Sequence, residues 1–268
     1  MSGAFLRVGD VVLHHRVVDG SAERLPLVFS NSLGTDFRIW DGVVERLAGT
    51  RPIVLYDKRG HGLSDLGTPP YRIDDHVADL AGLLDALALP RVVVCGLSVG
   101  GLVAQGLHAA HPGRVAALVL ADTAHRIGDD ALWNARIDAV REHGLASIAD
   151  ATLERWFSAR FLDPANAAAA GYRNLLVRAS AEGYAGTCAA VRDADFSEQA
   201  RRIDVPTLCL VGEHDVATPP ALVAELAARI PGARLETIAG AGHLPCVERP
   251  DVTARLVADF LDELERAT

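Results

Sequence analysis

One serine in this sequence has the surroundings of a nucleophile. Ser98 is the centre of residues 96–100, Gly-Leu-Ser-Val-Gly, which follow the apolar run 92–95 and precede the helical run 102–110. A G-x-S-x-G pattern between a strand and a helix is typical of a sharp turn that exposes the serine hydroxyl at a helix N-terminus. Glycine is needed on both sides because the turn leaves no room for a side chain. The pattern predicts Ser98 as nucleophile and the Val99 amide as a donor to an oxyanion.

A serine hydroxyl needs a base, and the base needs an acid to orient it. His243 and Asp215 follow the last two short apolar runs of the chain, so both should lie on loops at the carboxyl ends of neighbouring strands. We therefore expect Ser98, Asp215 and His243 to form a catalytic triad. Glu213 and Asp122 compete with Asp215, which is favoured because its loop directly follows the penultimate strand. Asp122 is expected to cap the start of the helical segment that follows it.

A second oxyanion donor should come from the loop of small residues at 30–35. Small side chains let the backbone approach a ligand, and the Leu33 amide is favoured, with Gly34 and Ser32 as alternatives. His61 lies in a loop rich in glycine and charged residues. We expect a structural role for it.

These residues lie at the ends of short β-branched runs that alternate with longer amphipathic stretches, an alternation that predicts a mostly parallel sheet with helices on both faces. The predicted strands are 27–29, 53–56, 92–95, 118–120, 207–211 and 235–238, the predicted helices include 37–47, 74–87 and 250–264, and a hairpin of 5–8 and 11–17 adds two antiparallel strands. The sequence thus predicts an α/β fold with an eight-stranded sheet.

The alternation stops after residue 122, and the chain shows only helical patterns up to about residue 203. An all-helical insertion after the sixth strand predicts a cap over the carboxyl ends of the strands, where open α/β sheets bind ligands. We expect a core domain of residues 1–122 and 204–268 and a helical cap of residues 123–203.

Composition excludes several classes of partner. The 268 residues carry 26 Lys and Arg against 35 Asp and Glu, a net charge of −9, so we expect neither nucleic acid nor an anionic membrane as partner. No zinc-ligand spacing, phosphate-binding loop or dinucleotide-binding glycine pattern occurs, so we expect no metal ion and no cofactor. The four cysteines are too few and too dispersed for a disulfide framework. Arg7 and Asp10 interrupt the N-terminal apolar stretch that a signal peptide would need.

Five segments together carry a resemblance to a known family: NSLGTDFRIWD, YDKRGHGLSD, GLSVGG, GEHDVATPP and GAGHLPCVERP. The chain resembles the α/β-hydrolase superfamily throughout and, within it, the 3-oxoadipate enol-lactonases. The resemblance implies the α/β-hydrolase fold and supports the triad. It also implies a cytoplasmic enzyme of aromatic-compound degradation, in the β-ketoadipate pathway, that opens a small anionic enol-lactone to 3-oxoadipate. A serine at position 98 argues against the haloalkane dehalogenase and epoxide hydrolase branches, which use aspartate there.

The carboxylate of such a substrate needs a cationic partner in a partly apolar pocket, and arginine is suited to that role. The arginines of the expected cap are Arg126, Arg136, Arg155, Arg160, Arg173, Arg178 and Arg192. Arg136 is favoured because Trp133 lies one helical turn before it, on the same face. Arg160 and Arg192 are the next candidates.

Two other interpretations compete with the enol-lactonase hypothesis. Another carboxylesterase, lactonase or carbon–carbon bond hydrolase of the same superfamily would use the same triad on a different substrate. A ligand receptor would keep the fold without catalysis, but the complete set of Ser98, Asp215 and His243 argues against it.

Overall fold

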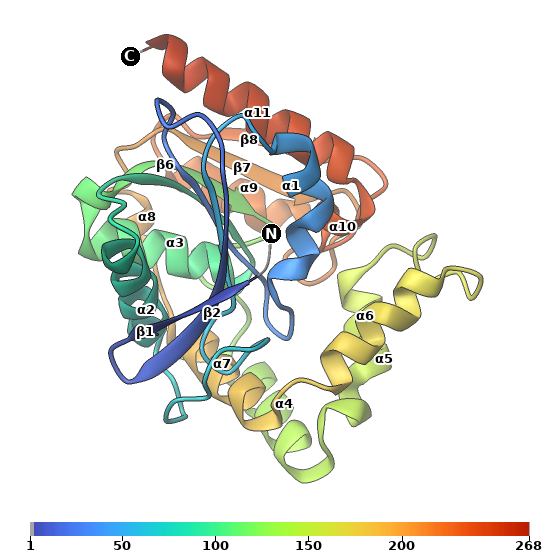
Figure 1. Cartoon of the computed structure of the whole chain (residues 1–268). Coiled ribbons are helices and arrows are strands. Elements are labelled where there is room, and N and C mark those ends of the chain that lie inside the picture. Colours follow the sequence, from blue (N-terminus) through green and yellow to red (C-terminus); the bar gives the residue numbers. More distant parts are fainter. Residues whose placement is uncertain (1–2, 268) are drawn as a thin grey trace.

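A computed structural model describes residues 3–267 and contains one eight-stranded sheet in the order β1-β2-β4-β3-β5-β6-β7-β8 (Figure 1). The strands are β1 (Ala4–Val8), β2 (Val11–Val18), β3 (Leu27–Ser30), β4 (Ile53–Tyr56), β5 (Val92–Leu97), β6 (Val115–Ala121), β7 (Thr207–Gly212) and β8 (Arg234–Ile238). β2 pairs antiparallel with β1 and β4, and every other pairing is parallel. The predicted fold class is confirmed.

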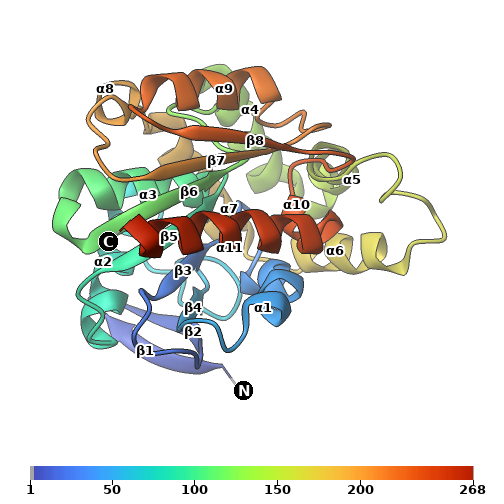
Figure 2. The same cartoon turned by 90° about the horizontal axis from the view of Figure 1, so that it is seen from above.

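The core helices lie in two layers because alternate strand residues point to opposite faces of the sheet. Leu27 and Phe29 face one layer, whereas Val28 between them faces the other. The first layer contains α1 (Asp41–Leu47) and α11 (Pro250–Ala267), which contact each other. The second contains α2 (Ile73–Ala86), α3 (Val99–Ala110) and α9 (Pro220–Arg229) (Figure 2). The shorter helices η1 (Phe37–Trp40), η2 (Pro112–Arg114) and α10 (Pro245–Glu248) lie in the connections.

Only helices occur between β6 and β7. They are α4 (Asp130–His143), η3 (Leu145–Ile148), α5 (Ala149–Trp156), α6 (Ala167–Val177), α7 (Ala181–Asp193) and α8 (Ser197–Ala200). α5 and α6 reach out from the body of the molecule, whereas α8 contacts α3 and α9 of the core (Figure 1). We retain residues 123–203 as the proposed cap. Within residues 3–267, no helix is both long enough and apolar enough to cross a membrane.

Candidate active site

Ser98 occupies a strained turn between β5 and α3. Its backbone has φ 58° and ψ −119°, values that a residue with a side chain rarely adopts. A Cβ atom on Gly96 would lie 2.2 Å from the carbonyl oxygen of Gly100, and one on Gly100 would lie 2.1 Å from the carbonyl oxygen of Ser30. Both glycines are therefore required by backbone packing. The turn places Ser98 directly before the first residue of α3, Val99, as the sequence pattern predicts.

His243 and Asp215 meet at the carboxyl ends of β7 and β8. The Nδ1 atom of His243 lies 2.8 Å from Oδ2 of Asp215. Asp215 also accepts hydrogen bonds from the amides of Ala217 and Thr218 and from the Thr218 hydroxyl. Burial alone would raise the pKa of Asp215, but the charge of His243 and these hydrogen bonds outweigh it and lower the pKa below its ordinary value. Asp215 is therefore a buried anion that can orient His243.

Ser98 and His243 line one small cavity of about 60 Å³. Leu33, Trp133 and Arg136 line it as well. Five residues that the sequence predicts for the site therefore meet at this cavity, although they are far apart in the chain. They come from the loop after β3 (Leu33), the turn after β5 (Ser98), the loop after β8 (His243) and helix α4 (Trp133 and Arg136). Val99 follows Ser98 at the start of α3, and Asp215 lies behind His243, so the whole predicted set falls in one region.

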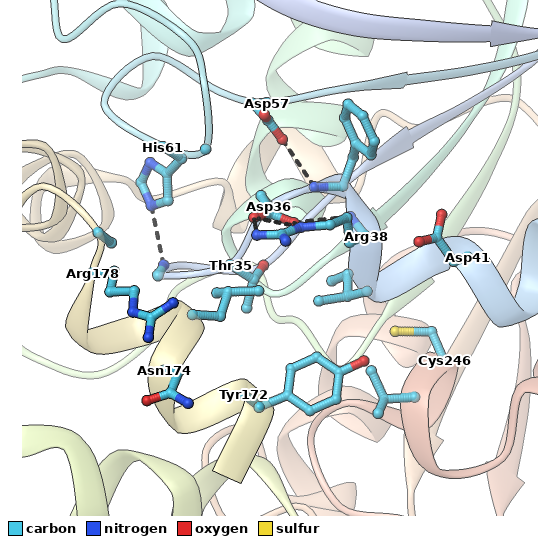
Figure 3. A pocket seen from close by; sticks show the side chains of 18 of the residues that line it. Thr35, Asp36, Arg38, Asp41, Asp57, His61, Tyr172, Asn174, Arg178 and Cys246 are labelled. Atoms are coloured by element: carbon cyan, nitrogen blue, oxygen red, sulfur yellow. Dashed lines mark hydrogen bonds and ion pairs between the residues drawn. The ribbon is translucent and has the colours of Figure 1, made fainter. Parts of the chain in front are cut away.

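The loop after β3 is held by two buried side chains. Lys58 donates from Nζ to the carbonyl oxygens of Asn31 (2.6 Å) and Ser32 (3.2 Å). The Gly34 amide donates to Nε2 of His61 at 3.0 Å. Figure 3 shows His61 directed at this loop. Because the Gly34 amide is already engaged, it is a weaker candidate for an oxyanion donor than the Leu33 amide next to it.

His61 can accept this hydrogen bond because its imidazole is neutral. Burial, and then the nearby charge of Lys58, lower the pKa of His61 to about 3. The imidazole is therefore neutral at physiological pH and can accept the Gly34 hydrogen bond.

Arg136 lies against Trp133 and points to the cap interior. Its guanidinium is 6.0 Å from the centre of the Trp133 ring and donates to the Tyr184 hydroxyl at 2.9 Å. The aromatic platform inferred from the sequence is present. Tyr184 also lines the Ser98 cavity, so the two side chains together form part of its wall.

A second arginine, Arg155, lines the same cavity, and the sequence argument did not single it out. Within residues 3–267 it forms no salt bridge or side-chain hydrogen bond. Burial, and then the charge of Arg136, lower its pKa. The signal that would have found it is the spacing of Thr152, Arg155 and Trp156, which places all three on one face of α5 and in the cavity wall.

The two arginines ranked after Arg136 lie elsewhere. Arg192 pairs with Asp193 and Asn134 at the surface, and exposed Arg160 lines a separate cavity. Neither is among the residues that line the Ser98 cavity.

The prediction that Asp122 caps the next helix is wrong. α4 begins at Asp130, and the side chain of Asp129 caps it by accepting from the Leu132 amide. Asp122 instead directly follows β6, has φ 43° and is fully buried. Its Oδ1 accepts from the Gly212 amide at 2.8 Å, at the end of the adjacent β7.

A larger cavity of about 810 Å³ separates α6 from η1 and α1 (Figure 3). Asp36 and Arg38, which pair with each other, lie on the core side, and Tyr172, Asn174 and Arg178 lie on the α6 side. This cavity does not include Ser98 or His243 among its lining residues. This cavity is a gap between the core and the arm that α5 and α6 form (residues 149–177), which we call the α5–α6 arm.

The fold and the serine turn define an α/β hydrolase, and comparison with known proteins gives the same class. The chain belongs to the alpha/beta hydrolase family, whose profile matches residues 27–256.

Within the family, the chain is similar to enol-lactonases. It is 38% identical to 3-oxoadipate enol-lactonase 2 of Acinetobacter baylyi over 245 residues, which cover 91% of each chain. The crystal structure of the enol-lactonase from Burkholderia xenovorans LB400 matches with a TM-score of 0.93 and 38% identity, over 97% of this chain and all of that one. A thermophilic esterase from Thermogutta terrifontis, solved with malate bound, matches with a TM-score of 0.91 and 25% identity over 98% and 99% of the two chains. The family resemblance inferred from the sequence is confirmed.

Proposed function

We propose that this hydrolase opens 3-oxoadipate enol-lactone to 3-oxoadipate by way of an acyl-enzyme, with Ser98 as nucleophile, His243 as base and Asp215 as the acid that orients it. The identity to an enol-lactonase over 91% of the chain supports the substrate class. The hydrogen bond between His243 and Asp215 supports the roles of the two residues. In this proposal the enzyme acts in the cytoplasm, in aromatic-compound degradation, without metal or cofactor.

The reaction begins when the Ser98 hydroxyl attacks the lactone carbonyl and His243 takes its proton. The amides of Leu33 and Val99 donate to the oxyanion of the tetrahedral intermediate. Collapse of the intermediate breaks the ring bond and expels the enolate oxygen, which takes the proton back from His243 and becomes an enol that remains tethered to the acyl group. Conversion of the enol to its ketone removes this internal nucleophile, so reclosure stops. His243 then activates water, which releases the acid and frees Ser98.

One observation carries the choice of an anionic substrate. Two arginines, Arg136 and Arg155, line the Ser98 cavity, and Arg155 forms no salt bridge with a carboxylate within residues 3–267. An unpaired, partly buried cation is costly, and a substrate carboxylate would remove that cost by pairing with it. Arg136 adds a second positive charge in the wall of the same cavity. This arrangement favours an acidic lactone over a neutral ester.

The test compares two substrates on the purified enzyme. We expect kcat/KM for the enol-lactone to exceed that for a neutral aryl ester by at least about 100-fold, the effect of roughly 3 kcal/mol of charge-assisted binding. Comparable values for the two substrates would instead favour a general carboxylesterase. Ser98→Ala should lower turnover of both by about 10⁶-fold, and unchanged turnover would remove the catalytic assignment.

A further inference from the structure

Asp122 lies beside Asp215 and His243, outside the lining of the Ser98 cavity, and none of the steps above uses it. One oxygen of its carboxyl group, one carboxyl oxygen of Asp215 and one imidazole nitrogen of His243 all lie within 4.8 Å of one another. All three side chains are buried, and Asp122 is fully so. Its Oδ1 accepts from the Gly212 amide, while its buried Oδ2 has no hydrogen-bond partner within residues 3–267. A second carboxyl group therefore lies beside the acid and base of the triad.

Two carboxyl groups this close inside a protein do not both carry a charge. Asp215 receives four hydrogen bonds, from His243, the Thr218 hydroxyl and two amides, whereas Asp122 receives one. The hydrogen bonds stabilise the anion on Asp215. Asp122 therefore keeps the proton.

The other titratable groups near Asp122 also favour its protonated form. Burial, and then the charge of Asp215, raise the pKa of Asp122 well above its ordinary value, and the nearby Glu248 adds to the rise. The buried Cys246 thiol also faces Asp122, and burial raises its pKa as well. His243, the one basic group of this cluster, already pairs with Asp215.

We propose that Asp122 is a positioning residue that serves as the neutral reserve acid of the triad, so that the buried pair Asp122 and Asp215 holds one proton and one negative charge. The inference rests on the proposed triad of Ser98, Asp215 and His243. In the intact enzyme the charge resides on Asp215. When Asp215 loses its charge, its repulsion of a negative charge on Asp122 disappears, and the imidazolium that forms on His243 during the reaction attracts one, so Asp122 gives up its proton despite its burial. The carboxylate within 4.8 Å of His243 then supports the imidazolium in place of Asp215.

A double-mutant cycle on hydrolysis of a neutral aryl ester tests this proposal. Asp122→Asn keeps the shape and the acceptor for the Gly212 amide, and we expect it to change kcat by less than about threefold in the wild-type background. Asp215→Asn alone should lower kcat by roughly 10²- to 10³-fold, because Asp122 takes over. The double variant Asp122→Asn and Asp215→Asn should lose roughly 10⁴-fold, the loss expected for a histidine without any carboxylate partner. Equal effects of Asp122→Asn in the two backgrounds would overturn the proposal.

The pH profile supplies a readout that a purely structural role would not move. Because Asp122 is neutral, Asp122→Asn should leave the acid limb of kcat/KM within about 0.3 pH unit of the wild type. Removal of a charged Asp122 would lower that limb by about 1 unit or more, since a nearby anion favours the protonated imidazole, and this result would also overturn the proposal.

Thr123→Val is the matched control. Thr123 is the next residue, equally buried, and donates from Oγ1 to the carbonyl oxygen of Ser98 at 2.7 Å, but it carries no charge. Its substitution should lower kcat by the same factor in both backgrounds, which shows that the coupling of Asp122 is electrostatic. The aryl ester keeps the test independent of the lactone assignment, and Ser98→Ala separately tests the triad. A cycle without coupling, in an enzyme that Ser98→Ala inactivates, would refute only the role of Asp122.

Discussion

In the proposed function, one side chain, Arg155, distinguishes the substrate of an otherwise common catalytic site. Serine, histidine and aspartate set the reaction, but the same three residues serve esters of any charge. Arg155 is partly buried, lines the Ser98 cavity and forms no salt bridge within residues 3–267, so a substrate carboxylate that pairs with it would offset its desolvation cost.

Arg155→Met therefore separates binding of the anion from catalysis. We expect KM for the enol-lactone to rise roughly 30-fold, the equivalent of about 2 kcal/mol for one charge-assisted hydrogen bond, with a smaller change in kcat. KM for a neutral aryl ester should change less than about twofold, because that substrate has no carboxylate. Steady-state kinetics on both substrates measures the difference. Arg160→Met, at an exposed position in a separate cavity, should change neither value, and equal shifts for the two substrates would exclude Arg155 as the carboxylate partner.

At the scale of elements, turns and loops position the site and the sheet only supports them. The serine turn was predictable because its glycines are dictated by backbone contacts within one short segment. β6 was predicted too short because its first residues include two alanines, which have little preference for strands, and only burial in the sheet shows them to be strand. The roles of Asp122 and Arg155 were not predicted for a different reason. Asp122 contacts Gly212, 90 positions away, which no local spacing reveals. The spacing of Thr152, Arg155 and Trp156 places them on one helix face but does not show that this face lines the Ser98 cavity.

The glycine contacts at the serine turn give a prediction about stability. Gly100→Ala should destabilise the fold by about 3 kcal/mol, because the added Cβ would lie 2.1 Å from a backbone oxygen of β3 that cannot move aside easily. Gly171→Ala is the matched control. Gly171 is exposed on α6 with no atom within 4 Å of the added Cβ, so its substitution should stabilise by about 0.5–1 kcal/mol through helix propensity. Urea unfolding of the two variants measures both effects, and equal values would contradict the steric argument.

Protein stability should depend on pH through His61, which holds the loop after β3 by accepting a hydrogen bond from the Gly34 amide. The pKa of His61 is about 3 in the folded protein against 6.5 when unfolded, so between these values only the unfolded chain binds the proton. Stability from His61 is therefore complete above pH 6.5 and is lost as the pH falls towards 3. At pH 5 the loss amounts to about 2 kcal/mol.

His61→Gln should remove this loss, because glutamine accepts the Gly34 hydrogen bond without titrating. The difference in unfolding free energy between pH 7 and pH 5 should shrink by about 2 kcal/mol relative to the wild type, as measured by denaturant titration at each pH. His143→Gln, at an exposed histidine in the last turn of α4, should leave the difference as in the wild type. An unchanged difference in His61→Gln would show that His61 is not held neutral by the fold.

For the whole molecule, two cavities of unequal size raise the question of how a substrate reaches Ser98. The cavity at Ser98 holds about 60 Å³, far below the roughly 300 Å³ at the lower end of small-ligand sites. The arm of α5 and α6 covers it with Thr152, Arg155 and Trp156, and the gap of about 810 Å³ between α6 and the core leaves the arm room to move. Glu248 ties the arm to the histidine loop by accepting from the amides of Ser158 and Gly242. We therefore expect this structure to be a closed state, which the proposed substrate enters when the arm moves away from the core.

Hydrogen exchange with and without product tests this motion. If 3-oxoadipate binds only the closed arm, amides of α5 that exchange through arm opening should slow about 100-fold at a product concentration of 100 times Kd, the equivalent of about 2.7 kcal/mol. Amides of α9, which packs on the sheet away from the arm and exchanges through its own local openings, should keep their rates. Arg155→Met should reduce the slowing to about fourfold at the same product concentration, because a roughly 30-fold weaker affinity leaves the product at only about three times its Kd. If the product does not change the exchange rates in α5, the arm does not control access to Ser98. The substrate would then have to enter through rearrangement of the cavity wall at Trp133 and Tyr184.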